Sequence, residues 1–327
     1  MAKVLEALIA KGRRVKRPRE QKEVAFGLAD LSTHEELHDR IVKKGGIRSL
    51  TELLKRSQDV EAQRFAALAI ANCASAVFTR VQMEIVGLGG IEALIGLLKA
   101  EDVESGRYAA FALSNIGANA NHREQIVSAG GVHALVALAC CEDLNAQRQA
   151  LSALRGLCIT PAYRVQVVRD GFLDPLVLMA RTDELVVLRE VAAALNCLSC
   201  MEENKMEIAD RAIANVIAMT MCGDIETERH ACCAIANLVE LPDLHNRLLE
   251  ERGLAPLVAL TTSGDANCRE EASRALANLA ANPDLQQAIL REGAMQPMVD
   301  ALGSSEVNCQ RFAALGLANL ATTVSCQ

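Results

Sequence analysis

One sequence theme recurs about every 41 residues, and this repetition constrains the fold more than any other feature of the chain. Seven segments of similar sequence share a marker residue, and successive markers are 43, 41, 41, 40, 41 and 41 residues apart. The markers are Asn72, Asn115, Gly156, Cys197, Asn237, Asn278 and Asn319, with Asp30 one step earlier. A period of about 40–47 residues is typical of stacked units of two or three helices.

Each unit also has internal punctuation. An apolar pair lies about 30 residues before each marker, then a glycine break, a Leu-rich stretch, a polar turn and the longer marker segment. The breaks are at Gly45/Gly46, Gly89/Gly90, Gly130/Gly131, Gly171, Gly253 and Gly293. Glycine there suits a helix end that needs a positive φ. The pattern predicts a short helix, a sharp bend, a second helix, a turn and a third helix.

Composition agrees with closely packed helices. The chain has 327 residues, of which 51% are apolar and only 2% aromatic, with no Trp. Ala, Leu, Val and Ile therefore fill the interior, and Ala has the best helix propensity. No single helix of such a unit buries its apolar face alone, so we expect neighbouring units to stack into a continuous core.

The repeated pattern A-x-x-A-L-x-N-L, with I-V-x-x-G-G-I upstream, resembles the armadillo repeat, as in the units of β-catenin, importin-α and the yeast vacuolar armadillo protein. The resemblance covers residues 20–327 and implies an all-α, right-handed superhelical solenoid with three helices per unit. Residues 1–32 are expected to form a partial cap repeat, with helices at 3–11 and 20–32 and a basic loop at 11–19. Residues 33–327 are expected to form seven repeats in one continuous solenoid domain.

The resemblance further implies that the third helices line a concave groove, where the marker asparagines bond the backbone of an extended partner peptide. An Asn amide offers both a donor and an acceptor, so it pairs with peptide groups without reading their sequence. Five positions match: Asn72, Asn115, Asn237, Asn278 and Asn319. Gly156 and Cys197 depart from the pattern. The open alternative is that these asparagines bond neighbouring loops.

A basic ladder precedes the markers by eight residues, with one exception at Glu270. Its members are Arg64, Arg107, Arg148, Arg189, Arg229 and Arg311. Eight residues are just over two helical turns, so each arginine lies on roughly the same side as its marker. The ladder could attract an acidic peptide and hold its carboxylates bidentately. Alternatively, the arginines pair with local acids such as Glu61, Glu104 and Glu226, or stack between repeats.

The position four residues before each marker bears on partner chemistry. In importin-α it carries a Trp that clamps lysine side chains. Here the residues are Leu68, Phe111, Ser152, Ala193, Cys233, Arg274 and Leu315. Without Trp we do not expect recognition of basic localisation signals, and we expect an acidic or mixed partner. Phe111 joins the candidate groove residues.

Charge is concentrated near the start of the chain. The net charge is −7, yet residues 11–19 hold six basic side chains and no acid. They are Lys11, Arg13, Arg14, Lys16, Arg17 and Arg19. The acidic remainder disfavours nucleic-acid binding, and Pro18 with the run of like charge predicts an exposed loop. This basic loop could be a solvated loop, a nuclear localisation signal, a contact for an acidic protein tail or a weak contact for anionic membranes.

Two short motifs suggest chemistry but lack a full ligand set. HEELH (34–38) matches a zinc metalloprotease pattern, yet it falls where the other units have a first helix, with no third ligand evident. CLSC (197–200) has no second pair or His cluster to complete a metal site. We therefore expect no catalytic residue, no metal, no cofactor and no small-molecule substrate.

Twelve cysteines occur without a signal peptide, which favours reduced, buried thiols and a cytoplasmic location, with the nucleus as a second one. No apolar run has the length of a membrane span, so membrane contact is expected only weakly and through the basic loop.

The sequence thus predicts a non-enzymatic adaptor or scaffold that binds an extended, acidic protein segment in its concave groove. The alternative is a structural component of a larger cytoskeletal or ciliary assembly, packing through its outer faces and ends. The chain stops at Gln327, directly after a third helix, so we expect either a longer protein or end-to-end self-association.

Overall fold

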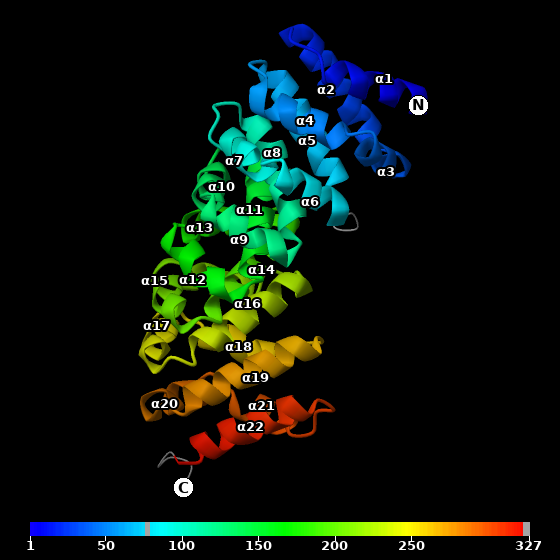
Figure 1. Cartoon of the computed structure of the whole chain (residues 1–327). Helices are drawn as coiled ribbons and strands as arrows, with labels where there is room; N and C mark the ends of the chain where they lie inside the picture. Colours follow the sequence, from blue (N-terminus) through cyan, green and yellow to red (C-terminus); the bar gives the residue numbers. More distant parts are fainter. Residues whose placement is uncertain (76–78, 323–327) are drawn as a thin grey trace. The chain divides into compact units, whose positions relative to one another are not determined.

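A computed structural model describes residues 1–75 and 79–322. Within these residues there are 22 α-helices, one short 3-10 helix and no strand, which confirms the predicted all-α class (Figure 1). Two compact units are distinguished, Met1–Tyr163 and Arg164–Gln327, and we refer to them as unit 1 and unit 2. The predicted single continuous domain stays a prediction.

Unit 1 is built on four long helices, α2, α5, α8 and α11, which pack in sequence order. Shorter helices join them. The bounds are α1 Ala2–Gly12, α2 Pro18–Ser32, α3 Glu35–Lys43, α4 Gly46–Arg56, α5 Val60–Cys73, α6 Thr79–Gly87, α7 Gly90–Leu98, α8 Val103–Gly117, α9 Ala120–Ser128, α10 Gly131–Ala139 and α11 Leu144–Cys158.

Unit 2 repeats the arrangement with α14, α16, α19 and α22 as its packed long helices. Helix α12 (Pro161–Arg169) contains the boundary between the two units. The other bounds are α13 Leu173–Met179, α14 Leu185–Ser199, α15 Glu202–Met219, α16 Ile225–Leu238, η1 Pro242–Leu244, α17 His245–Glu250, α18 Leu254–Leu260, α19 Ala266–Ala280, α20 Pro283–Arg291, α21 Met295–Ala301 and α22 Val307–Leu320. The eight long helices of the two units are the predicted third helices.

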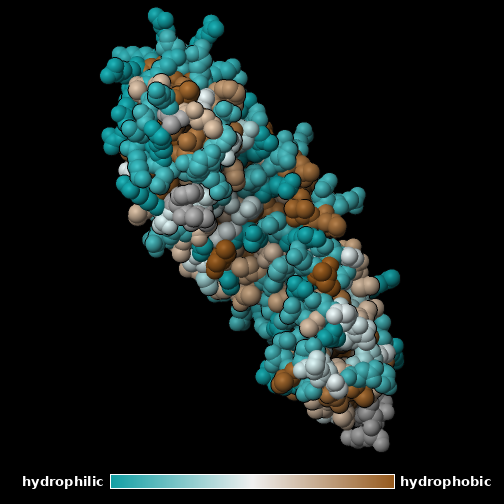
Figure 2. Space-filling model, turned by 90° about the vertical axis from the view of Figure 1, so that its right-hand side faces the viewer, coloured by the Kyte–Doolittle hydropathy of each residue, from teal (hydrophilic) through white to brown (hydrophobic). Residues whose placement is uncertain are grey.

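Small apolar side chains let the third helices approach closely. In α5, for example, Ala66, Ala69 and Ile70 are fully buried. Polar side chains cover most of the face seen in Figure 2, and apolar ones appear there in small groups. The buried surface therefore lies between successive repeats, as a stack of incomplete units requires.

The glycine breaks behave as predicted at five positions, where φ is positive: Gly45 (75°), Gly89 (72°), Gly130 (78°), Gly171 (93°) and Gly293 (80°). At Gly253 the prediction is wrong, because its φ is −73° and Arg252 takes the positive φ of 59°. A Cβ on Gly253 would lie 2.5 Å from Leu248 Cδ1. Gly253 thus corresponds to the second glycine of pairs such as Gly45/Gly46, where the absence of a Cβ lets the preceding helix come close.

One repeat lacks the bend between its first two helices. Helix α15 runs without a break over 18 residues, Glu202–Met219. The break would fall at Ala212/Ile213, in register with Gly171 one repeat earlier and Arg252/Gly253 one repeat later, and no glycine is present there, so nothing interrupts the helical backbone. The predicted three-helix unit is therefore wrong for this repeat.

The basic segment forms the predicted loop only in part. Helix α1 ends at Gly12 and α2 begins at Pro18, so Lys11 and Arg19 lie on helices while 13–17 form the turn. Proline suits the first helical position because its missing N–H would be unpaired there.

None of the eleven cysteines in the described residues forms a disulfide. Five are buried, as predicted, but Cys140 and Cys200 are exposed because each follows the last turn of a helix. Cys326 lies outside the described residues. In the same part of the chain no single helix has the length and apolarity to cross a membrane; α6 and α7 pass that test only together, with a 79° bend between them.

The bend glycines give a matched test of backbone conformation. A Cβ at Gly130 or at Gly96 of α7 would meet no atom within 4 Å, but only Gly130 has positive φ. We expect Gly130→Ala to lower the free energy of unfolding by about 1–2 kcal/mol and Gly96→Ala to raise it by up to about 1 kcal/mol. Urea unfolding of the two variants measures this. Equal effects of the same sign would contradict the assigned role of the bend.

Candidate functional site

The marker asparagines lie near the carboxyl ends of the third helices, and four of them bond to the preceding repeat. The Asn115 amide nitrogen donates to Ala71 O at 2.9 Å and that of Asn319 donates to Ala277 O at 3.2 Å. The Asn72 amide donates to Ser32 Oγ at 3.0 Å. One end of these amides therefore fixes the stacking. No donor in residues 1–75 and 79–322 reaches the amide oxygens of Asn72, Asn115 and Asn319, which leaves three acceptors for a partner.

Three ladder arginines form bidentate pairs with the Asp that caps the next third helix. Arg64 Nη2 and Nε lie 2.7 and 3.2 Å from the Asp102 carboxylate. The Arg189–Asp224 and Arg229–Asp265 pairs have the same form, with closest distances of 2.6 and 2.5 Å. Each Asp also accepts from a backbone N–H of its own helix. One carboxylate thus caps a helix and joins two repeats.

These contacts hold the carboxylates ionised. The Arg229 guanidinium, followed by the Cys268 N–H, lowers the pKa of Asp265 to about 2 against the opposing effect of burial. The hydrogen bond from Arg189 is the largest cause of the lowered pKa of Asp224. The positive charge of these arginines is offset within the repeat stack.

The remaining ladder positions vary. Arg107 bonds to Glu104 of its own helix at 2.9 Å, and Arg311 lies over the Phe312 ring at 4.9 Å. Arg148 is exposed. At the exception, Glu270, the neighbouring Arg269 pairs with Glu306 at 2.9 Å instead. Four of the ladder arginines are therefore paired with acids of the repeat stack, which is the alternative that the sequence left open: Arg64, Arg107, Arg189 and Arg229.

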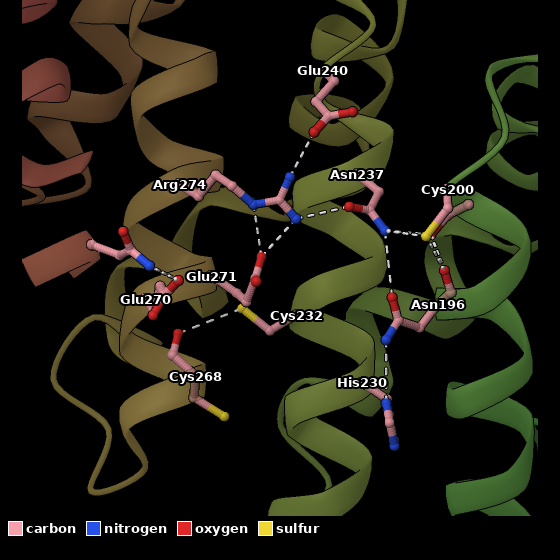
Figure 3. Close-up of polar contacts among 12 residues, drawn as sticks. Asn196, Cys200, His230, Cys232, Asn237, Glu240, Cys268, Glu270, Glu271 and Arg274 are labelled. Atoms are coloured by element: carbon pink, nitrogen blue, oxygen red, sulfur yellow. Dashed lines mark hydrogen bonds and ion pairs between the residues drawn. The ribbon is translucent and has the colours of Figure 1, made fainter. Parts of the chain in front are cut away.

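In unit 2 a polar network links α14, α16 and α19 around Arg274 (Figure 3). Arg274 donates to Glu240 at 2.6 Å, to Glu271 at 2.6–2.8 Å and to the Asn237 amide oxygen at 2.8 Å. The Asn237 nitrogen donates in turn to Ser199 Oγ at 3.1 Å. Asn237 is only 8% exposed, so both ends of its amide serve packing between repeats.

Two thiols near this network are held in their neutral form. Burial raises the pKa of Cys233 to about 11 and of Cys268 to about 12. A thiol needs a lowered pKa to act as a nucleophile, so these side chains contribute packing.

Beyond Arg274 a groove of about 660 Å³ opens between residues 239–245, which follow α16, the end of α19 with the start of α20, and α22. Its lining includes two predicted site residues, Asn278 and Asn319, together with Leu315. Leu315 is 49% exposed, and no side-chain bond of Asn278 is found within the described part of the chain. The remaining lining residues are Val239, Glu240, Pro242, His245, Ala277, Ala281, Asn282 and Pro283.

Aromatic side chains gather on third helices of unit 1. Phe111 is half-buried on α8. The Phe26 and Phe65 rings meet edge-on at 5.1 Å, and Phe26 is 56% exposed. Phe26 precedes Asp30 by four residues, so the clamp position carries Phe26, Leu68 and Phe111 in three successive units.

The motif histidine His38 has a structural role. It is buried, and its Nε2 lies 2.7 Å from Ser32 O at the end of the preceding third helix. The same task falls to Gln82, Arg123, Asn204, His245 and Gln286 in other repeats. Sequence reasoning missed this position, since its residue type varies. No group of three metal-ligating side chains is found in the described residues.

Helices stacked in this way define a class, the α-helical repeat solenoids, and comparisons with known proteins identify the family. The profile of the Armadillo/beta-catenin-like repeat matches residues 119–159 and 247–281. These spans correspond to α9–α11 and to most of α17–α19. The chain therefore contains armadillo repeats in these two segments.

Solved structures agree. An engineered protein is 28% identical, with 98% of this chain and 89% of that chain covered and a TM-score of 0.74. A computationally designed armadillo repeat protein for modular peptide recognition is 21% identical, covering 70% and 99%, with a TM-score of 0.66. Another designed armadillo repeat protein, in complex with the peptide (KR)4, is 21% identical, covering 70% and 99%, at 0.64. No curated protein sequence matches.

The lowered pKa of Asp265 predicts how pH acts on the repeat stack. A depressed folded-state pKa contributes stability above the ordinary value of 3.8, which is lost as pH falls toward about 2. Asp265→Asn keeps a capping oxygen but removes the charge. We expect the free energy of unfolding of the wild type to exceed that of this variant by about 1 kcal/mol at pH 6, after allowance for solvent screening.

Urea unfolding between pH 6 and pH 2 measures this difference, which is expected to shrink steadily as pH falls below 4. Asp210→Asn on α15 is the matched control, because Asp210 is exposed and has no ion pair in the described residues. A constant difference across this pH range would show that the Arg229–Asp265 charge pair contributes nothing.

Proposed function

We propose that this protein is a non-enzymatic adaptor that holds an extended segment of a partner protein along its third-helix face. The observation that carries the proposal is the groove in unit 2, where Asn278 and Asn319 stand one repeat apart beside the exposed Leu315. Their amides can pair with backbone groups while Leu315 receives an apolar side chain. Armadillo folds commonly bind proteins, and one designed neighbour is a complex with a peptide.

The partner's charge is the finer part of the proposal. The designed neighbour holds the basic peptide (KR)4, but this chain has no Trp to clamp lysine side chains. Arg148 and Arg311 pair with no acidic side chain of the described residues, which favours an acidic or mixed segment. Arg64, Arg189 and Arg229 are already paired, so their attraction for acids is reduced. We also propose a cytoplasmic location, which the absence of disulfides among the described cysteines supports.

A displayed library of random extended peptides tests the groove directly. We expect wild type to enrich a consensus with an apolar anchor, and Leu315→Asp with Asn278→Ala to reduce affinity for it by at least about tenfold. Neither substitution breaks a side-chain hydrogen bond of the described residues, so we expect the fold to persist. Circular dichroism would verify this.

The control variant is Met206→Asp, which adds the same negative charge as Leu315→Asp but on the exposed surface of α15. If both variants keep full affinity, or the library yields no ligand, the groove is not the binding site. The alternative of a structural subunit that packs through its outer faces would then be favoured.

A further inference from the structure

The basic loop forms one wall of a pocket of about 560 Å³ in unit 1. Residues 12–16 close one side, Gln21 of α2 contributes at the edge, and α4 forms the other side through Arg48, Ser49, Glu52, Leu53 and Arg56. This volume falls in the range of small-molecule sites, about 300–1,000 Å³. The sequence segment read as a loop is thus part of a concave site.

The pocket is strongly and locally positive. Five basic side chains line it, Arg13, Arg14, Lys16, Arg48 and Arg56, against one acid, Glu52. Arg56 pairs with Glu52 at 2.8 Å. Arg14, Lys16 and Arg48 are exposed and have no acidic partner within residues 1–75 and 79–322. Such crowding of like charge in an otherwise acidic chain is unfavourable unless an anion is bound.

The walls of the pocket are held in place. Arg13 Nη2 donates to Lys44 O at 2.6 Å and so ties the loop to the end of α3. A Cβ on Gly12 would lie 3.1 Å from Val24 Cγ1 and 3.4 Å from Ser49 Cβ, so the glycine allows close approach of the end of α1 to α2 and α4. Ser57 Oγ holds Gln21 at 2.8 Å. A site organised before binding loses less entropy when the ligand arrives.

We propose that this pocket binds a compact anion that carries several phosphate groups. Guanidinium groups hold phosphates bidentately, and several phosphates on one small scaffold match several cations around one small pocket. An extended acidic peptide fits less well, because its successive side chains point to opposite sides about 3.3–3.6 Å apart. The proposal is independent of the groove and of the function proposed for it.

Isothermal titration with inositol hexakisphosphate, at about 150 mM salt to screen loose surface charge, tests the site on the full chain. We expect Arg14→Gln with Arg48→Gln to weaken binding at least tenfold. The matched control is Arg17→Gln with Arg19→Gln, which removes the same charge from the same segment outside the pocket. Their side chains are 84% and 92% exposed, and less than a threefold loss is expected.

Equal losses in the two variants, or no binding by wild type, would overturn the proposal. If circular dichroism shows that the Arg14/Arg48 double variant is unfolded, the affinity of Lys16→Gln for inositol hexakisphosphate is compared with that of the Arg17/Arg19 control instead, and an equal loss would again overturn the proposal. Displacement of inositol hexakisphosphate by octaglutamate at equal concentration would also overturn it, in favour of an acidic protein segment.

Vesicles of phosphatidylcholine with and without 5% phosphatidylinositol bisphosphate then separate the two sources of the ligand chemistry. Co-sedimentation that requires the phosphorylated lipid and is abolished by inositol hexakisphosphate supports a lipid headgroup. Binding of the soluble probe without any vesicle binding supports a free polyphosphate.

Discussion

Within each unit, the packing of each third helix against the following one is the constraint on which the structure depends, because these helices bury their small apolar side chains against one another. Small side chains such as Ala66 and Ala69 allow the helices to meet closely, but smooth surfaces alone fix register poorly. The arginine–aspartate pairs supply the register. Since Asp102 caps α8 and pairs with Arg64 of α5, the start of one third helix is positioned by the previous one.

This use of charge has a consequence for recognition. An arginine held bidentately by an aspartate inside the stack offers little net field to a ligand, so a row of arginines in the sequence does not by itself make a groove attractive to acids. Uncompensated positive charge remains at Arg148 and Arg311 of the ladder and, in the pocket of unit 1, at Arg14, Lys16 and Arg48. Three ladder arginines lie next to a helix-capping aspartate and are paired with it. Which arginines can bind a ligand therefore depends on their position relative to these aspartates more than on their number.

The sequence was sufficient for what a 41-residue period encodes: the third helices, the glycine bends and the family. It failed where one residue replaces the function of another. Arg252 takes the positive φ expected of glycine, and α15 passes through a bend because no glycine stops it. The sequence analysis did not decide the partners of Arg64 and Arg229. Their aspartates lie 38 and 36 residues later in the chain, and this similar spacing could have indicated the pairs. The basic pocket was out of reach, because it depends on how 12–16 fold onto α4.

The network around Arg274 finally limits where a partner can lie in unit 2. Arg274 occupies the position four residues before a marker, where an aromatic clamp would be expected in a peptide-binding repeat. It instead binds Glu271 of its own helix and, from the preceding repeat, Asn237 of α16 and Glu240 just after α16. Displacing its two carboxylate partners would leave the Arg274 side chain, which is only 17% exposed, without a counter-charge, which costs more than an ion pair contributes, so the network resists displacement by a ligand. The accessible part of the face therefore begins beyond it, at Asn278, Leu315 and Asn319, and a partner is expected to engage this short stretch of the third helices.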